Sequence, residues 1–211
     1  MALRDYLAWH EEYARPGSPL HLRLLVVRDL IARALDELPA GSVRLVSMCA
    51  GQGRDILTVA ARHRRGADVT GRLVELDPRN VEAARADAAT AGLSAIEVAQ
   101  GDAGISDAYA GATPADLMLV CGVFGNISLP DMEQTVRFLP SLCAPGAWVV
   151  WTRHPREPAV IPSIERWFAE SGFHEQAIVV SEAAQFGVGA HRFAGDPRPF
   201  APGVRLFDFV R

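Results

Sequence analysis

Apolar residues in the first forty positions recur every three or four residues, a spacing that predicts helices. One helix is expected over residues 3–14 and a longer one over about 19–38, and each ends in a run containing proline, glycine or serine. No shift in composition separates these helices from the rest of the chain. We therefore interpret residues 1–40 as an N-terminal helical lid or extension of a main domain that spans residues 41–211.

From residue 43 the apolar positions form short runs separated by amphipathic stretches. The runs predict five strands, at 43–48, 69–76, 95–99, 115–121 and 147–152. The stretches between and after them predict helices at 54–63, 79–91, 130–142 and 158–171. Alternation of this kind, with short loops, is typical of a parallel sheet covered by helices on both faces.

The last forty residues have a different pattern. They predict two or three further strands, near 175–181, 187–193 and 204–210. Residues 204–210 alternate between apolar and polar side chains and follow no helix, so we expect them to form a closing antiparallel strand. The predicted fold is therefore α/β: a doubly wound, mostly parallel seven-stranded sheet with an antiparallel C-terminal strand and an N-terminal helical extension.

The identity of the basic residues narrows the classes of enzyme to which the chain can belong. All 21 are arginine, and the chain contains no lysine. This excludes Schiff-base enzymes and Walker-type phosphate loops, which need a lysine amine. The net charge of −4 and the pI of about 5.9 lack the basic footprint of a nucleic-acid-binding protein. We interpret the one basic run, Arg62-His63-Arg64-Arg65, as the solvated last turn of a helix.

The cysteines and the apolar runs bear on location and partners. Cys49, Cys121 and Cys143 lack the spacing of a disulfide framework or a zinc site, which favours a reducing, cytoplasmic setting. No segment has the length and apolar character of a transmembrane helix, and the first residues do not resemble a signal peptide. We expect no membrane or nucleic-acid partner, no bound metal, and a monomer or homodimer.

Candidate chemistry lies where the predicted parallel strands end, because ligands of open α/β sheets bind there. The first strand runs into the glycine-rich turn 49–53, which lets a ligand approach the backbone closely. Glu75 ends the second strand and can accept both hydroxyls of a ribose, and Asp102 follows the third and can accept a purine amine. About one strand–helix unit separates each feature from the next. The sequence therefore predicts a site for an adenosine-type ligand.

This order of motifs resembles the class I S-adenosylmethionine-dependent methyltransferases of the small-molecule type, over roughly residues 40–180. The matching segments are Ser47-Met-Cys-Ala-Gly-Gln-Gly53, Glu75-Leu-Asp-Pro78 and Gln100-Gly-Asp-Ala103. The resemblance implies a Rossmann-like fold, S-adenosyl-L-methionine as methyl donor and S-adenosyl-L-homocysteine as product. The cofactor contacts that it implies are Cys49, Ala50, Gly51, Gln52, Gly53, Glu75, Leu76, Asp102, Ala103, Cys121, Gly122 and Val123.

The first motif departs from the family pattern at two positions. Ser47 stands where the family has an acid, and Cys49 stands where it has its first glycine. The acid usually orients the methionine part of the cofactor. How this chain holds the amino group is therefore a separate question, although the Ser47 hydroxyl can still form a hydrogen bond.

Candidates for catalysis follow the fourth and fifth strands. Asn126 could position a substrate, or it could be an ordinary turn residue. His154 is the best candidate for a general base because imidazole titrates near neutral pH, and its alternative is a surface histidine. The substrate or lid candidates are His10, Tyr13, Phe124 and Arg153. His191 is a further candidate for a pocket residue.

Two other functions remain open at this level. The Gly-x-Gly turn also suits an NAD(P)-dependent oxidoreductase, although Ile56 stands at the third glycine position of that fingerprint. A non-catalytic cofactor-binding protein would share the same motifs. The preferred hypothesis is a metal-independent methyltransferase that acts on a small molecule.

Overall fold

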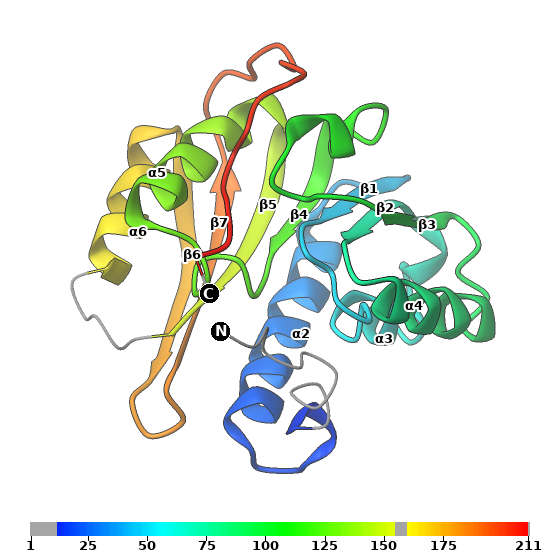
Figure 1. Ribbon diagram of the computed structural model, residues 1–211. Coiled ribbons are helices and arrows are strands. Elements are labelled where there is room, and N and C mark those ends of the chain that lie inside the picture. Colours follow the sequence, from blue (N-terminus) through cyan, green and yellow to red (C-terminus); the bar gives the residue numbers. More distant parts are fainter. Residues whose placement is uncertain (1–11, 155–159, 211) are drawn as a thin grey trace.

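The structure, a computed structural model, describes residues 12–154 and 160–210 of the 211-residue chain. Seven strands form one sheet in the order β3-β2-β1-β4-β5-β7-β6 (Figure 1). The strands are β1 (Val43–Ser47), β2 (Val69–Glu75), β3 (Ile96–Gln100), β4 (Ala115–Val120), β5 (Cys143–Arg153), β6 (Phe173–Ser181) and β7 (Phe186–Phe193). Strands β1 to β5 are parallel, and β7 lies antiparallel between β5 and β6. The predicted α/β fold, with its antiparallel strand near the C-terminus, is confirmed.

Helices cover both faces of the sheet. The α-helices are α2 (Pro19–Glu37), α3 (Ile56–Ala60), α4 (Pro78–Thr90), α5 (Leu129–Phe138) and α6 (Val160–Glu170). The short 3-10 helices are η1 (Glu12–Ala14), η2 (Gly66–Asp68), η3 (Ser106–Tyr109) and η4 (Leu139–Ser141). Helices α2, α3 and α4 share one buried apolar cluster with the sheet, and α5 and α6 share the other (Figure 1). The sheet is therefore the middle layer of three.

The N-terminal region contributes to the core. Val27, Ile31 and Leu35 form the buried side of α2, and Ser18 caps the helix by accepting a hydrogen bond from the backbone N–H of His21 at 3.1 Å. Of the helix predicted over residues 3–14, only Glu12–Ala14 is described, as η1. The proposed division at residue 40 stays a prediction.

The expectation for residues 204–210 was wrong. They form no strand of the sheet; residues 203–210, which we call the C-terminal strap, lie along the loops that follow β3 and β4 (Figure 1, red). The backbone N–H of Leu206 donates to the Gly104 carbonyl at 2.7 Å, and that of Val210 donates to the Asn126 carbonyl at 2.8 Å. A Cβ atom on Gly104 would lie 2.4 Å from the Phe207 carbonyl oxygen, so glycine permits this close approach. The antiparallel strand of the sheet is β7 instead.

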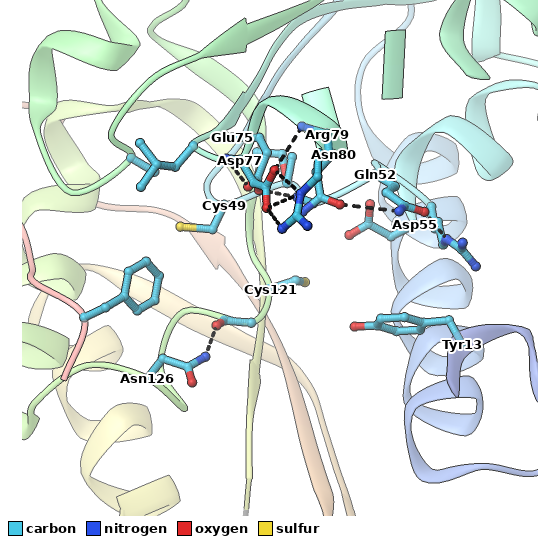
Figure 2. A pocket seen from close by; sticks show the side chains of 18 of the residues that line it. Tyr13, Cys49, Gln52, Asp55, Glu75, Asp77, Arg79, Asn80, Cys121 and Asn126 are labelled. Atoms are coloured by element: carbon cyan, nitrogen blue, oxygen red, sulfur yellow. Dashed lines mark hydrogen bonds and ion pairs between the residues drawn. The ribbon is translucent and has the colours of Figure 1, made fainter. Parts of the chain in front are cut away.

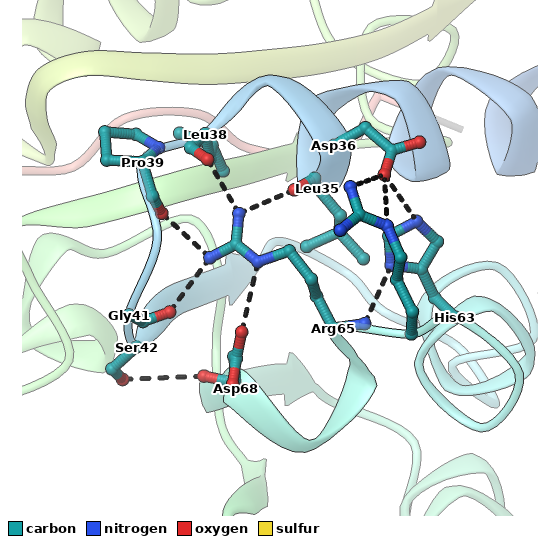
Figure 3. Close-up of polar contacts among 10 residues, drawn as sticks. Leu35, Asp36, Leu38, Pro39, Gly41, Ser42, His63, Arg65 and Asp68 are labelled. Carbon is teal, nitrogen blue, oxygen red and sulfur yellow. Dashed lines mark hydrogen bonds and ion pairs between the residues drawn. The ribbon is translucent and has the colours of Figure 1, made fainter.

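The expectation for the basic run was also wrong at Arg65. Its side chain is only 10% exposed, whereas the Arg64 side chain is 71% exposed. The Arg65 guanidinium donates to the four backbone carbonyls of Leu35, Leu38, Pro39 and Gly41 at 2.6–2.9 Å, and it pairs with Asp68 (Figure 3). Arg65 therefore caps the C-terminal end of α2 from inside the protein, where the exposed carbonyls of a helix need donors.

The helix predicted at 54–63 is shorter than expected. Only Ile56–Ala60 is helical, and the chain then turns so that Gly66 lies against Ala60. A Cβ atom on Gly66 would lie 1.7 Å from the Ala60 carbonyl oxygen. This tight turn brings Arg65 to the end of α2.

Candidate functional site

The carboxyl ends of β1, β2, β3 and β4 open onto a cavity of about 730 Å³ (Figure 2). This volume lies within the range of small-molecule and cofactor sites. Its walls come from the turn after β1, the loops after β2, β3 and β4, the start of α2 and the C-terminal strap.

The turn after β1 forms the floor of the cavity. Cys49, Gly51 and Gly53 have φ angles of 50°, 56° and 66°, in the left-handed region that favours glycine. Cys49 adopts this conformation with a side chain, at the position where the resemblance leads one to expect glycine. The Ala50 N–H donates to the Val74 carbonyl at 2.9 Å, which fixes the turn against β2.

Glu75 links this turn to the end of β2. One carboxylate oxygen accepts the N–H of Gly51 at 2.8 Å, and the other accepts the N–H of Asp77 at 2.9 Å. The residue is 9% exposed and lines the cavity. A carboxylate has about four acceptor positions, so it can accept further hydrogen bonds from a ligand.

Helix α4 begins directly after this acid. Asp77 accepts the N–H of Arg79 at 2.9 Å as the N-cap of the helix, and its carboxylate pairs with the Arg79 guanidinium at 2.6 Å. These hydrogen bonds to Arg79 lower the pKa of Asp77. Leu76, between the two acids, is 63% exposed, which makes it a bare apolar surface at the edge of the cavity.

Asp102 is held from two sides. One oxygen accepts the N–H of Gly104 at 2.8 Å, and the other pairs with the Arg205 guanidinium at 2.6 Å. Arg205 belongs to the C-terminal strap, which also places Phe209 on the cavity wall.

The start of α2 and the segment before it form the wall at the other end. Arg23 donates to the Tyr13 hydroxyl at 2.6 Å, and both residues line the cavity with the 9% exposed Asp55. One Asp55 oxygen accepts the Ile56 N–H at 2.7 Å at the start of α3. Burial raises the pKa of Asp55, and the nearby guanidinium groups of Arg28 and Arg23 partly offset this. Figure 2 shows the Tyr13 hydroxyl and the Asp55 side chain on the same side of the cavity.

The family of the chain follows from its sequence and agrees with this geometry. The model of the family described as "Putative methyltransferase" matches residues 19–170. The chain belongs to this methyltransferase family. No curated protein matches it in sequence.

Solved structures with the same fold include methyltransferases. Magnesium protoporphyrin IX methyltransferase from Synechocystis, solved with bound SAH, has a TM-score of 0.67 at 10% identity, over 90% of this chain and 94% of that protein. The CurJ carbon methyltransferase has a TM-score of 0.65 at 15% identity, over 88% and 58%. An O-methyltransferase family protein from Burkholderia thailandensis has a TM-score of 0.59 at 15% identity, over 80% and 56%, so this chain spans little more than half of it. At these identities the likeness establishes the class I methyltransferase fold.

Most residues that the resemblance implied for the methyltransferase cofactor lie around this one cavity. Lining it are Cys49, Ala50, Gly51, Gln52, Glu75, Leu76, Asp102, Ala103, Cys121 and Gly122, together with Asn126 and Tyr13. Gly53 lies behind the turn, where its Cα faces Leu57 and Leu73. Val123 and Phe124 are fully buried in the apolar core and do not line the cavity. The roles of all these residues stay predictions.

The candidates at the end of β5 and directly after it lie outside the cavity wall. Arg153 is 8% exposed and His154 is partly exposed, and neither is among the described residues that line the cavity. His10 lies outside the described residues. His191 is in the core, where its ring stacks on Phe168 with centroids 4.2 Å apart and its Nδ1 accepts the indole N–H of Trp151.

The structure also brings residues to this cavity that the sequence did not single out. They are Arg23, Leu24, Arg54, Asp55, Arg79, Asn80 and Phe209. Asp55 could have been noticed as an acid two residues beyond the glycine turn. Arg23 had no such signal, because helical spacing alone does not show which polar residue of α2 faces a ligand.

The two thiols in the cavity wall are poor nucleophiles. Burial raises the pKa of Cys49 and of Cys121, so both are protonated at neutral pH. Among residues 12–154 and 160–210, no group of three or more histidine, cysteine, aspartate or glutamate side chains could hold a metal ion. Within the same ranges, no helix has the length and apolar character needed to cross a bilayer.

Proposed function

We propose that this protein is an S-adenosyl-L-methionine-dependent methyltransferase whose acceptor is a small molecule. One observation carries the proposal: Glu75, Asp102 and the Gly51 turn line the same cavity, in the order that an adenosine needs. The methyltransferase family and the fold support it. A nicotinamide cofactor has weaker support, because Ile56 opens α3 where its fingerprint needs a glycine.

The residues present fit the nucleoside part of the cofactor. The acceptor positions of Glu75 that Gly51 and Asp77 leave open can accept ribose hydroxyls. Asp102 is placed to accept a purine amine, and the exposed Leu76 side chain offers an apolar surface for the purine ring.

Methyl transfer requires little further chemistry from the protein. The bound cofactor supplies an activated methyl group on its sulfonium, and the chain must hold an acceptor in line with it. Asn126 is suited to orient that acceptor, because it lines the cavity and its Nδ2 donates to the Gly122 carbonyl at 2.7 Å, which fixes the side chain in the wall. Tyr13 contributes a hydroxyl whose pKa burial raises, so it stays protonated.

The proposal includes a small-molecule acceptor, a reaction without a metal ion and a cytoplasmic setting. A small-molecule acceptor is supported by the size of the cavity, and metal independence by the lack of clustered metal-binding side chains in the described ranges. A cytoplasmic setting is supported by the cysteines, which are free in the described part of the chain, because free thiols persist in a reducing compartment.

Calorimetric titration with S-adenosyl-L-homocysteine tests the proposal. We expect saturable binding that Glu75→Ala and Glu75→Gln each weaken by about tenfold or more, because buried acceptors for the ribose are lost. Glu97→Ala is the matched control, since Glu97 is an exposed acid on β3 that pairs with Arg72 on β2. A folded protein that shows no binding at millimolar ligand would overturn the proposal.

A further inference from the structure

The cavity extends beyond the part that fits the nucleoside. Asp102 and Glu75 lie at the ends of β3 and β2, at one side of the sheet order β3-β2-β1-β4. The cavity continues past the β1 turn to Cys121 and Gly122, which follow β4. A ligand whose ribose lies at Glu75 therefore has its other end beside β4, the start of α2 and the start of α3.

That end of the cavity carries charges of both signs. Asp55 stands at the start of α3 and Arg23 on the first turns of α2. Both line the cavity, and Arg23 is near enough to lower the pKa of the Asp55 carboxyl. The Arg23 guanidinium donates to the Tyr13 hydroxyl and presents five N–H donors in all.

Asp55 is a buried acid with room for a cationic partner. The residue is 9% exposed, and the hydrogen bond that its side chain makes within the described ranges goes to the N–H of Ile56. No arginine among the described residues forms an ion pair with it. A buried carboxylate that no ion pair neutralises is unfavourable, and burial raises its pKa, an effect that the nearby guanidinium groups of Arg28 and Arg23 offset only in part. A ligand ammonium at this place would remove that cost.

We propose that Asp55 binds the ammonium and that Arg23, steadied by Tyr13, binds the carboxylate of the amino-acid end of the cofactor. The inference rests on the proposed function. It also accounts for the serine that stands at the acid position of the first motif. Ser47 is 1% exposed and neutral, and Asp55, eight residues later, supplies the negative charge that binds the ammonium. Asp55 and Arg23 are then positioning residues, which set where the cofactor's sulfur lies relative to Asn126.

Three nucleoside thioethers test this assignment by calorimetry. S-adenosyl-L-homocysteine has the complete amino-acid end, its decarboxylated form keeps only the amine, and 5′-methylthioadenosine lacks both. Asp55→Asn should weaken the first two by about tenfold or more and leave methylthioadenosine within about twofold. Arg23→Met should weaken the first alone.

The controls are charge changes away from the cavity. Asp87→Asn lies on the exposed side of α4, and Arg33→Met lies on α2 beside Glu37. Both should leave all three affinities unchanged. Asparagine can still cap α3, so Asp55→Asn is expected to fold, and circular dichroism checks this.

The outcomes separate this inference from the proposed function. If none of the three compounds binds the unaltered protein, the proposed function fails. Suppose that all three compounds bind the unaltered protein, but that each variant weakens the binding of all three to the same extent or of none. The ligand class then stands, and the assignment of Asp55 and Arg23 is overturned.

Discussion

The guanidinium of Arg205 lies 2.6 Å from the carboxylate of Asp102, although 103 positions separate the two residues in the chain. Asp102 stands after β3, where the nucleoside base is expected, and Arg205 belongs to the C-terminal strap. The strap thus sets the position of an acid that the proposed cofactor needs. The side chains of both partners are 47% exposed, so the pair is expected to add little to overall stability.

Replacing Arg205 should therefore affect ligand binding more than folding. We predict that Arg205→Met weakens binding of S-adenosyl-L-homocysteine about threefold, because Asp102 loses the partner that fixes its side chain. The free energy of unfolding should fall by less than about 1 kcal/mol. Calorimetry and urea unfolding measure the two effects. Arg198→Met, an exposed arginine whose guanidinium donates only to the Arg137 carbonyl among the described residues, is the control; tighter binding by Arg205→Met would mean that Arg205 competes with the ligand.

Arg65 should matter far more for stability than its exposed neighbour. Arg65→Met leaves four backbone carbonyls at the end of α2 without their donor and should lower the free energy of unfolding by about 3–5 kcal/mol. Arg64→Met removes only an exposed pair with Asp36 and should cost less than about 1 kcal/mol. Urea unfolding compares the two variants, and equal losses would contradict the capping role of Arg65.

His191 should make the protein sensitive to acid. Burial lowers the pKa of this histidine to about 4, from an ordinary value near 6.5. The unfolded chain then binds the proton first, so the stability that neutral His191 contributes is complete above pH 6.5 and is lost as the pH falls toward 4. The loss is on the order of 3 kcal/mol by pH 4.

The variant His191→Gln should lose this part of the pH dependence, because glutamine does not titrate and can still accept the Trp151 N–H. Unfolding in urea at a series of pH values from 7 to 4 measures it. His174→Gln, at an exposed position of β6, should keep the dependence of the unaltered protein. A profile for His191→Gln that parallels the unaltered protein would disprove the assignment.

The parallel part of the fold was predictable because most of its strands are short apolar runs between turn residues; β5 (Cys143–Arg153) is longer than the run at 147–152 that predicted it. β1 and β4 were placed to within a residue, since Val43–Ser47 and Ala115–Val120 are buried almost throughout. The cavity floor was predictable for a related reason: a parallel sheet brings the ends of β1, β2 and β3 to one edge.

The C-terminal strap was not predictable from periodicity. Leu206 and Phe207 are adjacent and would point to opposite faces of a strand, yet both are buried, since the strap packs into the core without joining the sheet. The same limit applies to charges. Nothing in Arg62–Arg65 distinguishes the buried Arg65 from the exposed Arg62 and Arg64. Nothing within α2 marks Arg23 either, because the surroundings of both residues depend on contacts with distant segments.

Helix α2 joins two places that perform different tasks. Its 19 residues span roughly 28 Å, with Arg23 in the cavity near one end and the Arg65 cap at the other. A helix is stiff over this length, so a change of its anchoring at Arg65 would alter the angle at which Arg23 meets a ligand. A random-mutagenesis screen for lost activity would then find substitutions at position 65 as well as substitutions in the cavity wall. The distance of a residue from the ligand would be a poor guide to its importance for activity.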